Sequence, residues 1–304
     1  MNIKILVAYH KKAPLYKNEV LVPIHVGRAV AKEKSKDGVI SNNDLKWLQD
    51  NMIGDDTGDN ISELNREVNE WTGLYWAWKN YDKLGNPDYI GLCHYRCFFE
   101  LPCLFKRFFS HFLCQQGYSE KNMVHLLEEY DFICVKPEHA STNKDITFEG
   151  WQKVVQLSEN YHPLLYKEYL RFKKDQNFYN CNMFLMKKED FFNMCQECMP
   201  IMFDLIKKSK EDFVEAVFGR NSDLVKQHDG WYPRSIGYAM EYISCFYFMH
   251  LMNKRKTLYV EKKDFKRKSF VQKICSLENE RWEGHKIKVL TILGVRIIVK
   301  KEEK

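Results

Sequence analysis

The segment Asp88-Tyr-Ile-Gly-Leu-Cys-His-Tyr-Arg96 does most to decide the fold of this chain. Its apolar part has the length and composition of a buried strand, and three polar or aromatic residues, His94, Tyr95 and Arg96, follow at the strand's end. In open α/β sheets, ligands bind at this carboxyl edge. The segment therefore predicts a strand that ends in an anion-binding site. The structural alternative is that Arg96 pairs with a surface carboxylate and His94 caps the strand.

Strands and helices alternate on both sides of this segment. Such alternation indicates an α/β fold with a mainly parallel central sheet flanked by helices and a helix-rich C-terminal half. We expect one globular domain over residues 1–260 and a basic tail over 261–304. The sequence predicts strands at 3–8, 20–24, 89–93 and 131–135, a turn at 54–60, and helices at 65–80, within 148–206, at 201–218 and at 236–252.

The composition excludes several classes of protein. Apolar residues make up 45% of the 304 residues, which is enough for a large core, and 14 glycines and 8 prolines are too few for a fibrous protein. The ten cysteines fit reduced core thiols better than a secreted disulfide scaffold; four lie in apolar runs, at Cys93, Cys134, Cys181 and Cys245. The N-terminus lacks signal-peptide features, and no apolar run reaches the ~20 residues of a membrane span. We therefore expect a cytoplasmic protein.

Positive charge is concentrated at the C-terminal end. Residues 254–304 contain 16 Lys or Arg and 7 Asp or Glu, a net charge of +9, whereas the whole chain carries +6. Residues 287–301 alternate basic and apolar positions. This pattern predicts that the tail contacts the anionic inner face of the cytoplasmic membrane, with a solvated edge strand or a disordered end as the alternative. It contains no RNA-binding motif, so no nucleic-acid partner is expected.

A second candidate site is the acidic turn Gly54-Asp-Asp-Thr-Gly-Asp-Asn60. Asp55 and Asp56 can hydrogen-bond a ribose or a sugar hydroxyl, or bind Mg²⁺ or Mn²⁺ together with Asp59. The alternative is a solvated acidic turn. The spacing of an EF-hand loop is absent.

A third candidate site is a carboxylate in an otherwise apolar helix. Glu241 lies within the apolar run Tyr238–Met252, and burying an unpaired carboxylate is costly, so Glu241 must be paired or functional. A glutamate with a raised pKa can take the proton from an acceptor hydroxyl as a general base. Arg234 is the expected partner of Glu241, and a purely structural Arg234–Glu241 ion pair is the alternative.

Read together, these segments resemble a bacterial family of polysaccharide-biosynthesis glycosyltransferases long catalogued as a domain of unknown function, which occurs in capsule, exopolysaccharide and lipo-oligosaccharide gene clusters. Cys97 and Tyr242 stand where the family pattern usually has arginine. The blocks that carry the resemblance are Ile24-His-Val-Gly-Arg-Ala29, residues 54–61, 70–80 and 88–98 and, more weakly, 182–187 and 234–241.

This resemblance implies a GT-A-like fold and a hexosyltransferase that uses a nucleotide-sugar donor, UDP-linked in some relatives, and a growing, lipid-linked surface glycan as acceptor. GT-A enzymes usually carry a metal-binding Asp-x-Asp where this chain has His94-Tyr95-Arg96. An arginine fork binds phosphate oxygens directly, so we expect weak or absent metal dependence, with Mg²⁺ or Mn²⁺ as the alternative. The predicted catalytic residues are Glu241 and Arg234, and the predicted donor-binding residues are Ala8, Tyr9, His10, Val26, Gly27, Asp55, Asp56, Asn60, Tyr75, Lys79, His94, Tyr95 and Arg96.

Two other functions remain open at the level of sequence. The chain can be a transferase that moves a sugar phosphate rather than a sugar. It can also be a carbohydrate-binding protein of the same pathway that has no catalytic activity.

Overall fold

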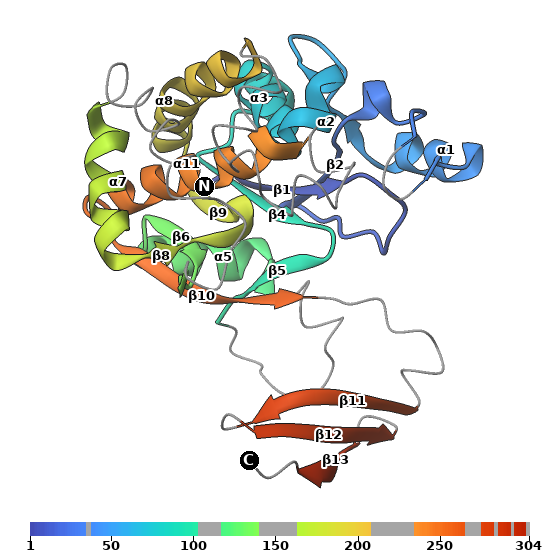
Figure 1. Ribbon diagram of the computed structural model, residues 1–304. Helices are drawn as coiled ribbons and strands as arrows, with labels where there is room; N and C mark the ends of the chain where they lie inside the picture. The colour runs from blue at the N-terminus through green and yellow to red at the C-terminus, as the bar shows by residue number, and fades with distance from the viewer. Residues whose placement is uncertain are drawn as a thin grey trace, which may run out of the picture. The chain divides into compact units, whose positions relative to one another are not determined.

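The computed structural model describes residues 1–34, 38–102, 117–139, 163–207, 234–264, 275–282, 285–292 and 295–301 (Figure 1). The chain divides into two units, Met1–Lys263 and Asp264–Lys304. The first unit is an α/β domain, and the second contains a three-stranded antiparallel sheet. The predicted helical segments at 148–162 and 208–218 lie outside the described residues.

An eight-stranded sheet forms the centre of the first unit. Its strand order is β3-β2-β1-β4-β5-β10-β6-β9, with an additional pairing of β4 with β9. The predicted strands all form, and each is buried along most of its length because its residues are almost all apolar. The strands are β1 (Ile3–Tyr9), β2 (Leu21–His25), β3 (Ile53–Gly54), β4 (Tyr89–His94), β5 (Cys97–Glu100), β6 (Phe132–Val135), β9 (Phe184–Lys187) and β10 (Thr257–Asp264).

The direction of these strands corrects one prediction. β1 pairs in parallel with β2 and β4, β2 with β3, and β6 with β10. However, β9 runs antiparallel to both β4 and β6, β5 runs antiparallel to β4, and β7 (Glu138–His139) and β8 (Asn177–Phe178) form a separate antiparallel pair. The sheet is therefore mixed rather than mainly parallel. Because β9 opposes both of its neighbours, β4 and β6 are parallel to each other, and their carboxyl ends meet at one edge of the sheet.

Helices pack against this sheet as Figure 1 shows. The predicted helix at 65–80 is two helices, because Asn69 adopts a non-helical conformation with a positive φ of 54° between them. The predicted helix at 201–218 is, as far as residue 207, the last third of α8. Among the described helices, none is long and apolar enough to cross a membrane. The helices are α1 (Asn42–Asn51), α2 (Asn65–Val68), α3 (Trp71–Lys79), α5 (Glu120–Glu129), α7 (Pro163–Asp175), α8 (Lys188–Lys207) and α11 (Ser235–Met252), with short 3₁₀ turns at Arg28–Val30, Ser62–Leu64, Tyr81–Leu84 and Asn180–Asn182.

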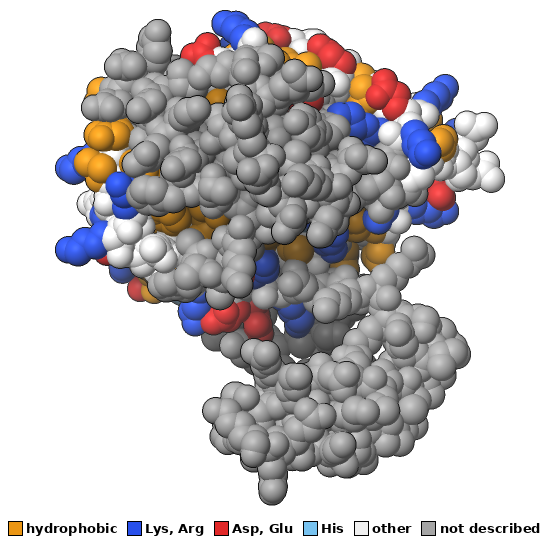
Figure 2. Space-filling view, in the orientation of Figure 1, with side chains coloured by type: hydrophobic (Ala, Val, Ile, Leu, Met, Phe, Trp, Pro, Cys, Tyr) orange, Lys and Arg blue, Asp and Glu red, His pale blue; other side chains and the backbone are white. Residues whose placement is uncertain are grey.

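The apolar helix α11 lies in the core of the first unit. It contacts α2, α7 and α8, and its Phe248 ring packs against Phe132 of β6 and Phe184 of β9. Of the cysteines predicted to lie in the core, Cys181 is partly exposed; the other three, Cys93, Cys134 and Cys245, are buried. Figure 2 shows charged side chains of both signs interspersed over the visible, described surface of this unit.

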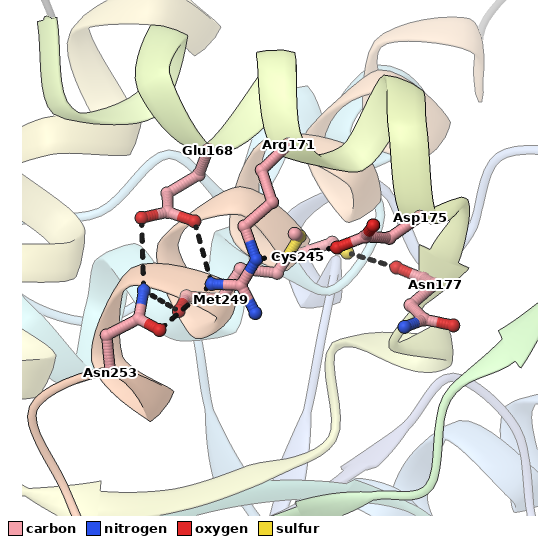
Figure 3. Close-up of polar contacts among 7 residues, drawn as sticks. All are labelled: Glu168, Arg171, Asp175, Asn177, Cys245, Met249 and Asn253. Atoms are coloured by element: carbon pink, nitrogen blue, oxygen red, sulfur yellow. Dashed lines mark hydrogen bonds and ion pairs between the residues drawn. The ribbon is translucent and has the colours of Figure 1, made fainter.

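A polar junction fixes the C-terminal end of α11 to α7 (Figure 3). The Glu168 carboxylate is only 3% exposed, and it accepts hydrogen bonds from Arg171 Nη1 at 3.4 Å and Asn253 Nδ2 at 3.2 Å. Arg171 Nη1 also donates to Asn253 Oδ1 at 2.9 Å. The buried charge is therefore both paired and hydrogen-bonded, as a carboxylate in a protein interior must be.

A glycine allows β9 to approach β4. A Cβ atom on Gly91 would lie 2.5 Å from the backbone oxygen of Phe184, which cannot move without separating the two strands. We expect Gly91→Ala to lower the free energy of unfolding by about 1–3 kcal/mol, measured from the urea midpoint. In the control Gly117→Ala, the new Cβ would meet Leu101 Cβ at an ordinary 3.7 Å. Equal midpoints for the two variants would contradict this account of the β4–β9 contact.

Candidate functional site

Four parallel strands end side by side at the carboxyl edge of the sheet. Ala8 is the register partner of His94, and Tyr9 is the register partner of His25. The segments that follow β1, β2, β3 and β4 therefore meet there. The last residues of these strands and the segments after them carry most of the predicted donor-binding residues: Ala8, Tyr9, His10, Val26, Gly27, Asp55, Asp56, His94, Tyr95 and Arg96.

Asp55 connects the loops at this edge. Its carboxylate is fully buried and accepts hydrogen bonds from Gly27 N (2.7 Å), Arg28 N (3.1 Å), Ser62 Oγ (2.5 Å) and Thr72 Oγ1 (2.6 Å). Burial raises the pKa of Asp55, and these four donors act in the opposite direction. Both oxygens are already engaged within the chain, so Asp55 holds the loop after β2 in place. Asp56, the next residue, is exposed.

A buried histidine and an arginine, His25 and Arg28, support the same loop, and neither had been predicted as a site residue. Arg28 Nε donates to His25 Nδ1 at 3.3 Å, and Arg28 Nη2 donates to the Met52 carbonyl at 2.9 Å. Burial, and then the charge of Arg28, lower the pKa of His25 to about 3, so His25 is neutral at physiological pH. The side chains of Arg28 and Asp56 both lie over Gly54, which has no side chain of its own to displace them.

The last residue of β4, His94, and the two residues after it, Tyr95 and Arg96, have different surroundings. Tyr95 stacks on Tyr9 with 5.4 Å between ring centroids and meets the edge of His10 at 5.4 Å. His94 Nε2 lies 2.7 Å from the carbonyl oxygen of Cys181, which can only accept, so His94 donates there. Arg96 is exposed, and within the described part of the chain no hydrogen bond or ion pair engages its guanidinium. Arg96 is therefore available to a ligand, whereas His94 orients the loop that contains Cys181.

The Cys181 loop joins this edge to Glu241 on α11. Cys181 adopts a left-handed φ of 68°, and its N–H donates to Glu241 Oε2 at 3.4 Å. Lys262 Nζ, from β10, lies 3.7 Å from the Cys181 sulfur. Burial is the main cause, and the charge of Glu70 the second, of a rise in the pKa of Glu241 to about 8; the Cys181 N–H and Lys262 act in the opposite direction. Glu241 can therefore gain and lose a proton near neutral pH.

A second carboxylate, Glu70 at the start of α3, belongs to the same cluster. Asn182 is 1% exposed and has a φ of 50°, and its Nδ2 donates to Glu70 Oε1 at 2.7 Å. Ser244 Oγ hydrogen-bonds the Asn182 side-chain oxygen and lies 2.9 Å from the Glu241 carbonyl. Sequence reasoning missed the roles of Glu70 and Asn182, although each begins a block of the family resemblance. We call Glu70, Cys181, Asn182, Glu241 and Lys262 the carboxylate cluster.

The expected pair of Arg234 with Glu241 does not form. Arg234 is the N-cap of α11, and among the described residues no ion pair links it to Glu241. Seven residues of helix separate the two by about 10 Å along the axis. Arg234 lies instead near Arg66, whose pKa is lowered by burial and, to a smaller degree, by the charge of Arg234.

Of the three other predicted donor-binding residues, Tyr75 and Lys79 belong to α3, and Asn60 belongs to the acidic turn after β3. Tyr75 OH donates to Asp59 Oδ1 at 3.0 Å, and Asn60 Nδ2 donates to the Gly58 carbonyl at 2.9 Å. Lys79 Nζ lies 3.8 Å from the centre of the Trp78 ring. Because Lys79 is seven residues from Thr72, it lies about 10 Å along the helix from the Asp55 network. Lys79 therefore lies farther along α3 than the side chains that hold Asp55, whereas Asn60 belongs to the segment after β3, and its Oδ1 accepts a hydrogen bond from Ser62 N at 3.2 Å.

The acidic turn does not have the geometry of a metal site. Asp55 is saturated with protein donors and Asp59 accepts from Tyr75. Throughout the described ranges, no three His, Cys, Asp or Glu side chains are grouped so that they can hold a metal ion.

Comparison with known proteins adds a family and a fold. The model of a family described as "Domain of unknown function (DUF4422)" matches residues 4–250. The apo structure of WbbM, titled a bifunctional glycosyltransferase, superposes with a TM-score of 0.64 at 20% identity over 93% of this chain and 48% of that chain. This chain therefore has the fold of one part of WbbM and spans about half its length. A search of curated protein sequences gives no significant match.

Proposed function

Because the chain belongs to the DUF4422 family and shares its fold with part of a bifunctional glycosyltransferase, we propose that it is itself a glycosyltransferase. It moves a hexosyl group from a nucleotide sugar, UDP-linked, to a hydroxyl of a growing, lipid-linked surface glycan of the capsule, exopolysaccharide or lipo-oligosaccharide type. The scaffold is GT-A-like and the reaction takes place in the cytoplasm. The observation that carries this proposal is the carboxylate cluster, where Glu241 has a pKa near 8 at the edge where ligands bind in α/β sheets.

The donor occupies the carboxyl edge of β1, β2 and β4 in this proposal. Arg96 is exposed and binds the diphosphate with its planar fork. Ala8, Tyr9, His10 and the Val26–Gly27 backbone surround the nucleotide, and Asp56 hydrogen-bonds the ribose or the sugar. Asp55 acts indirectly, because both of its carboxylate oxygens already hold the neighbouring loops, and His94 holds the Cys181 loop through its Nε2.

Glu241 acts as general base in the proposed reaction. It takes the proton from the acceptor hydroxyl while the acceptor oxygen forms a bond to the anomeric carbon. The bond from that carbon to the diphosphate oxygen breaks, and the nucleoside diphosphate leaves with the electron pair. Arg96 stabilises the negative charge that develops on this leaving group. Cys181 N–H orients the Glu241 carboxylate, and Glu70, held by Asn182, raises its basicity.

A thermal-shift screen across nucleotide sugars tests the donor site first. A ligand that binds only the folded protein raises its unfolding temperature as its concentration passes the Kd. We expect a UDP-linked sugar to give the largest shift, and the selected donor then serves in transfer assays. If no nucleotide sugar shifts the unfolding temperature, the proposed donor site is rejected.

Arg96→Ala is expected to weaken donor binding by roughly 10- to 150-fold, because a charge-assisted hydrogen bond contributes about 1.5–3 kcal/mol. Arg96→Lys keeps the charge but loses the planar fork, so it should fall between the alanine variant and the wild type. Lys46→Ala is the control, since Lys46 is exposed on α1 and pairs only locally, with Asp50 at 3.1 Å. Isothermal titration with the selected donor measures all three. An unchanged Kd in Arg96→Ala would remove Arg96 from the site.

Transfer is expected to continue in EDTA at close to its normal rate. The reason is that Arg96 supplies the positive charge, and the carboxylates of the acidic turn are not grouped to bind a divalent ion. Initial rates with and without EDTA measure this, with added MgCl₂ or MnCl₂ as the reverse test. Loss of turnover in EDTA that manganese restores would reject the metal-free donor site.

A further inference from the structure

The second unit contains a small antiparallel sheet whose register assigns each residue to a face. Its strands are β11 (Cys275–Trp282), β12 (His285–Ile292) and β13 (Val295–Lys301), and β12 pairs with both of the others. Directly paired residues share a face, and successive residues alternate between faces. Leu290, for example, pairs with Leu277 and with Ile297, so these three positions lie on one face.

Following the register through all three strands defines two faces of different charge. One face, which we call the first face, has four basic positions and no acidic position. The opposite face has both acidic positions, Glu278 and Glu280, together with Arg296 and Lys301, so these four charges sum to zero. The first face consists of Cys275, Leu277, Asn279, Arg281, Lys286, Lys288, Leu290, Ile292, Val295, Ile297 and Lys300.

The first face is also divided along the strands. Its apolar positions form two adjacent rows at one end, Cys275–Ile292–Val295 and Leu277–Leu290–Ile297. Its basic positions follow at the other end. There, Arg281 is the register partner of Lys286 on the neighbouring strand, and Lys288 is the register partner of Lys300. The first face therefore has apolar positions next to basic positions with no acidic residue among them. This arrangement is complementary to a lipid surface, which offers both acyl chains and anionic headgroups.

We propose that the first face docks on an anionic lipid surface. Each Lys or Arg near such a surface is attracted to its anionic headgroups, and the six apolar positions add the affinity that comes from burial at the headgroup boundary. Charge complementarity favours this occupant: four cations without a single acid suit an anionic bilayer, and residues 1–253 carry a net charge of about −3 (31 basic and 34 acidic residues), so the positive charge belongs to the C-terminal part.

Vesicle co-sedimentation of the full chain tests this proposal. The probes are vesicles of phosphatidylcholine alone and of phosphatidylcholine mixed with phosphatidylglycerol. We expect binding to the anionic vesicles only, and loss of that binding at about 1 M NaCl, where the Debye length is about 3 Å. Lys286→Glu/Lys288→Glu should weaken it by roughly tenfold or more. Arg296→Glu/Lys301→Glu changes the net charge equally on the opposite face and should weaken it much less.

Three outcomes would overturn the proposal: no sedimentation with anionic vesicles, equal loss in the two charge-reversal variants, or a dimer that dissociates when Leu290 and Ile297 are replaced while vesicle binding is unchanged. Circular dichroism checks that each variant is folded, and Lys286→Gln/Lys288→Gln replaces the glutamate variant if that one misfolds. The experiment needs no donor or acceptor, so its result is independent of the proposed transferase activity.

Discussion

Glu241→Gln is expected to reduce the rate of glycosyl transfer by about 10²–10⁴-fold, because general-base catalysis contributes a factor of this size. Glutamine has nearly the same shape and can still accept the hydrogen bond from Cys181 N–H, so the loop at 180–182 should keep its conformation. Donor affinity should change little, since Glu241 contacts the acceptor in the proposed reaction. Glu128→Gln, on the exposed face of α5, is the matched control. Full activity in Glu241→Gln would exclude this residue as the base.

The proposed role of Glu241 also predicts how the activity of the wild-type protein depends on pH. A base acts only when it is deprotonated, so transfer should rise about tenfold per pH unit below a pKa of about 8 and level off above it. Glu70→Gln removes the neighbouring negative charge, which lowers the pKa of Glu241 and moves this limb to lower pH. If the rise of the transfer rate with pH occurs over the same pH range in Glu70→Gln as in the wild type, the two carboxylates do not interact.

The raised pKa of Glu241 also affects stability, with a definite sign. Between the usual carboxyl pKa of 4.5 and the folded-state value of about 8, the folded protein binds more protons than the unfolded chain. Its free energy of unfolding therefore falls as the pH rises through this interval. Glu241→Gln should be more stable than the wild type at pH 9 and equally stable at pH 4, measured by thermal unfolding.

Asp55→Ala is expected to lower the free energy of unfolding by about 3–5 kcal/mol, because it removes the buried carboxylate that accepts hydrogen bonds from four donors of three different segments. Asp55→Asn should be nearly as harmful, since whichever way its amide is oriented, the NH₂ group faces two of these donors. Asp56→Ala, at the neighbouring exposed position, should change stability by less than about 0.5 kcal/mol. Urea unfolding measures all three. Similar midpoints for Asp55→Ala and Asp56→Ala would contradict the role of Asp55 as the centre of the loop network.

The sequence predicted the parts of the fold that depend on local composition. The runs that became β1, β2, β4 and β6 are short, apolar and rich in branched residues, so their boundaries were found to within one or two residues. The direction of β9 was not predictable in the same way, because it depends on how the chain returns from α7 and not on periodicity. The positive φ angles of Asn69 and Cys181 depend on tertiary contacts, and no pattern of residue types indicated them.

The sequence predicted those site residues that stand out within a single segment, and it missed those whose role depends on contacts between distant segments. The polar residues after β4 and the carboxylate of α11 stand out within their own segments, so sequence reasoning selected Arg96 and Glu241. Glu70 and Asn182 are 112 residues apart, and their contact is visible only in three dimensions. Arg234 was predicted as the partner of Glu241 because the two are close in sequence. In the structure, Arg234 lies at the N-terminus of α11, and seven residues of helix separate it from Glu241.

The mass of the reaction product tests the central claim most directly. With the donor selected by thermal shift and a glycan acceptor, this account predicts that the acceptor gains the mass of one sugar residue and that a nucleoside diphosphate is released. A gain equal to a sugar phosphate, with release of a nucleoside monophosphate, would mean that the chain transfers sugar phosphate instead. Tight donor binding without any product would identify it as a carbohydrate-binding protein, and either result would contradict the proposed glycosyl transfer.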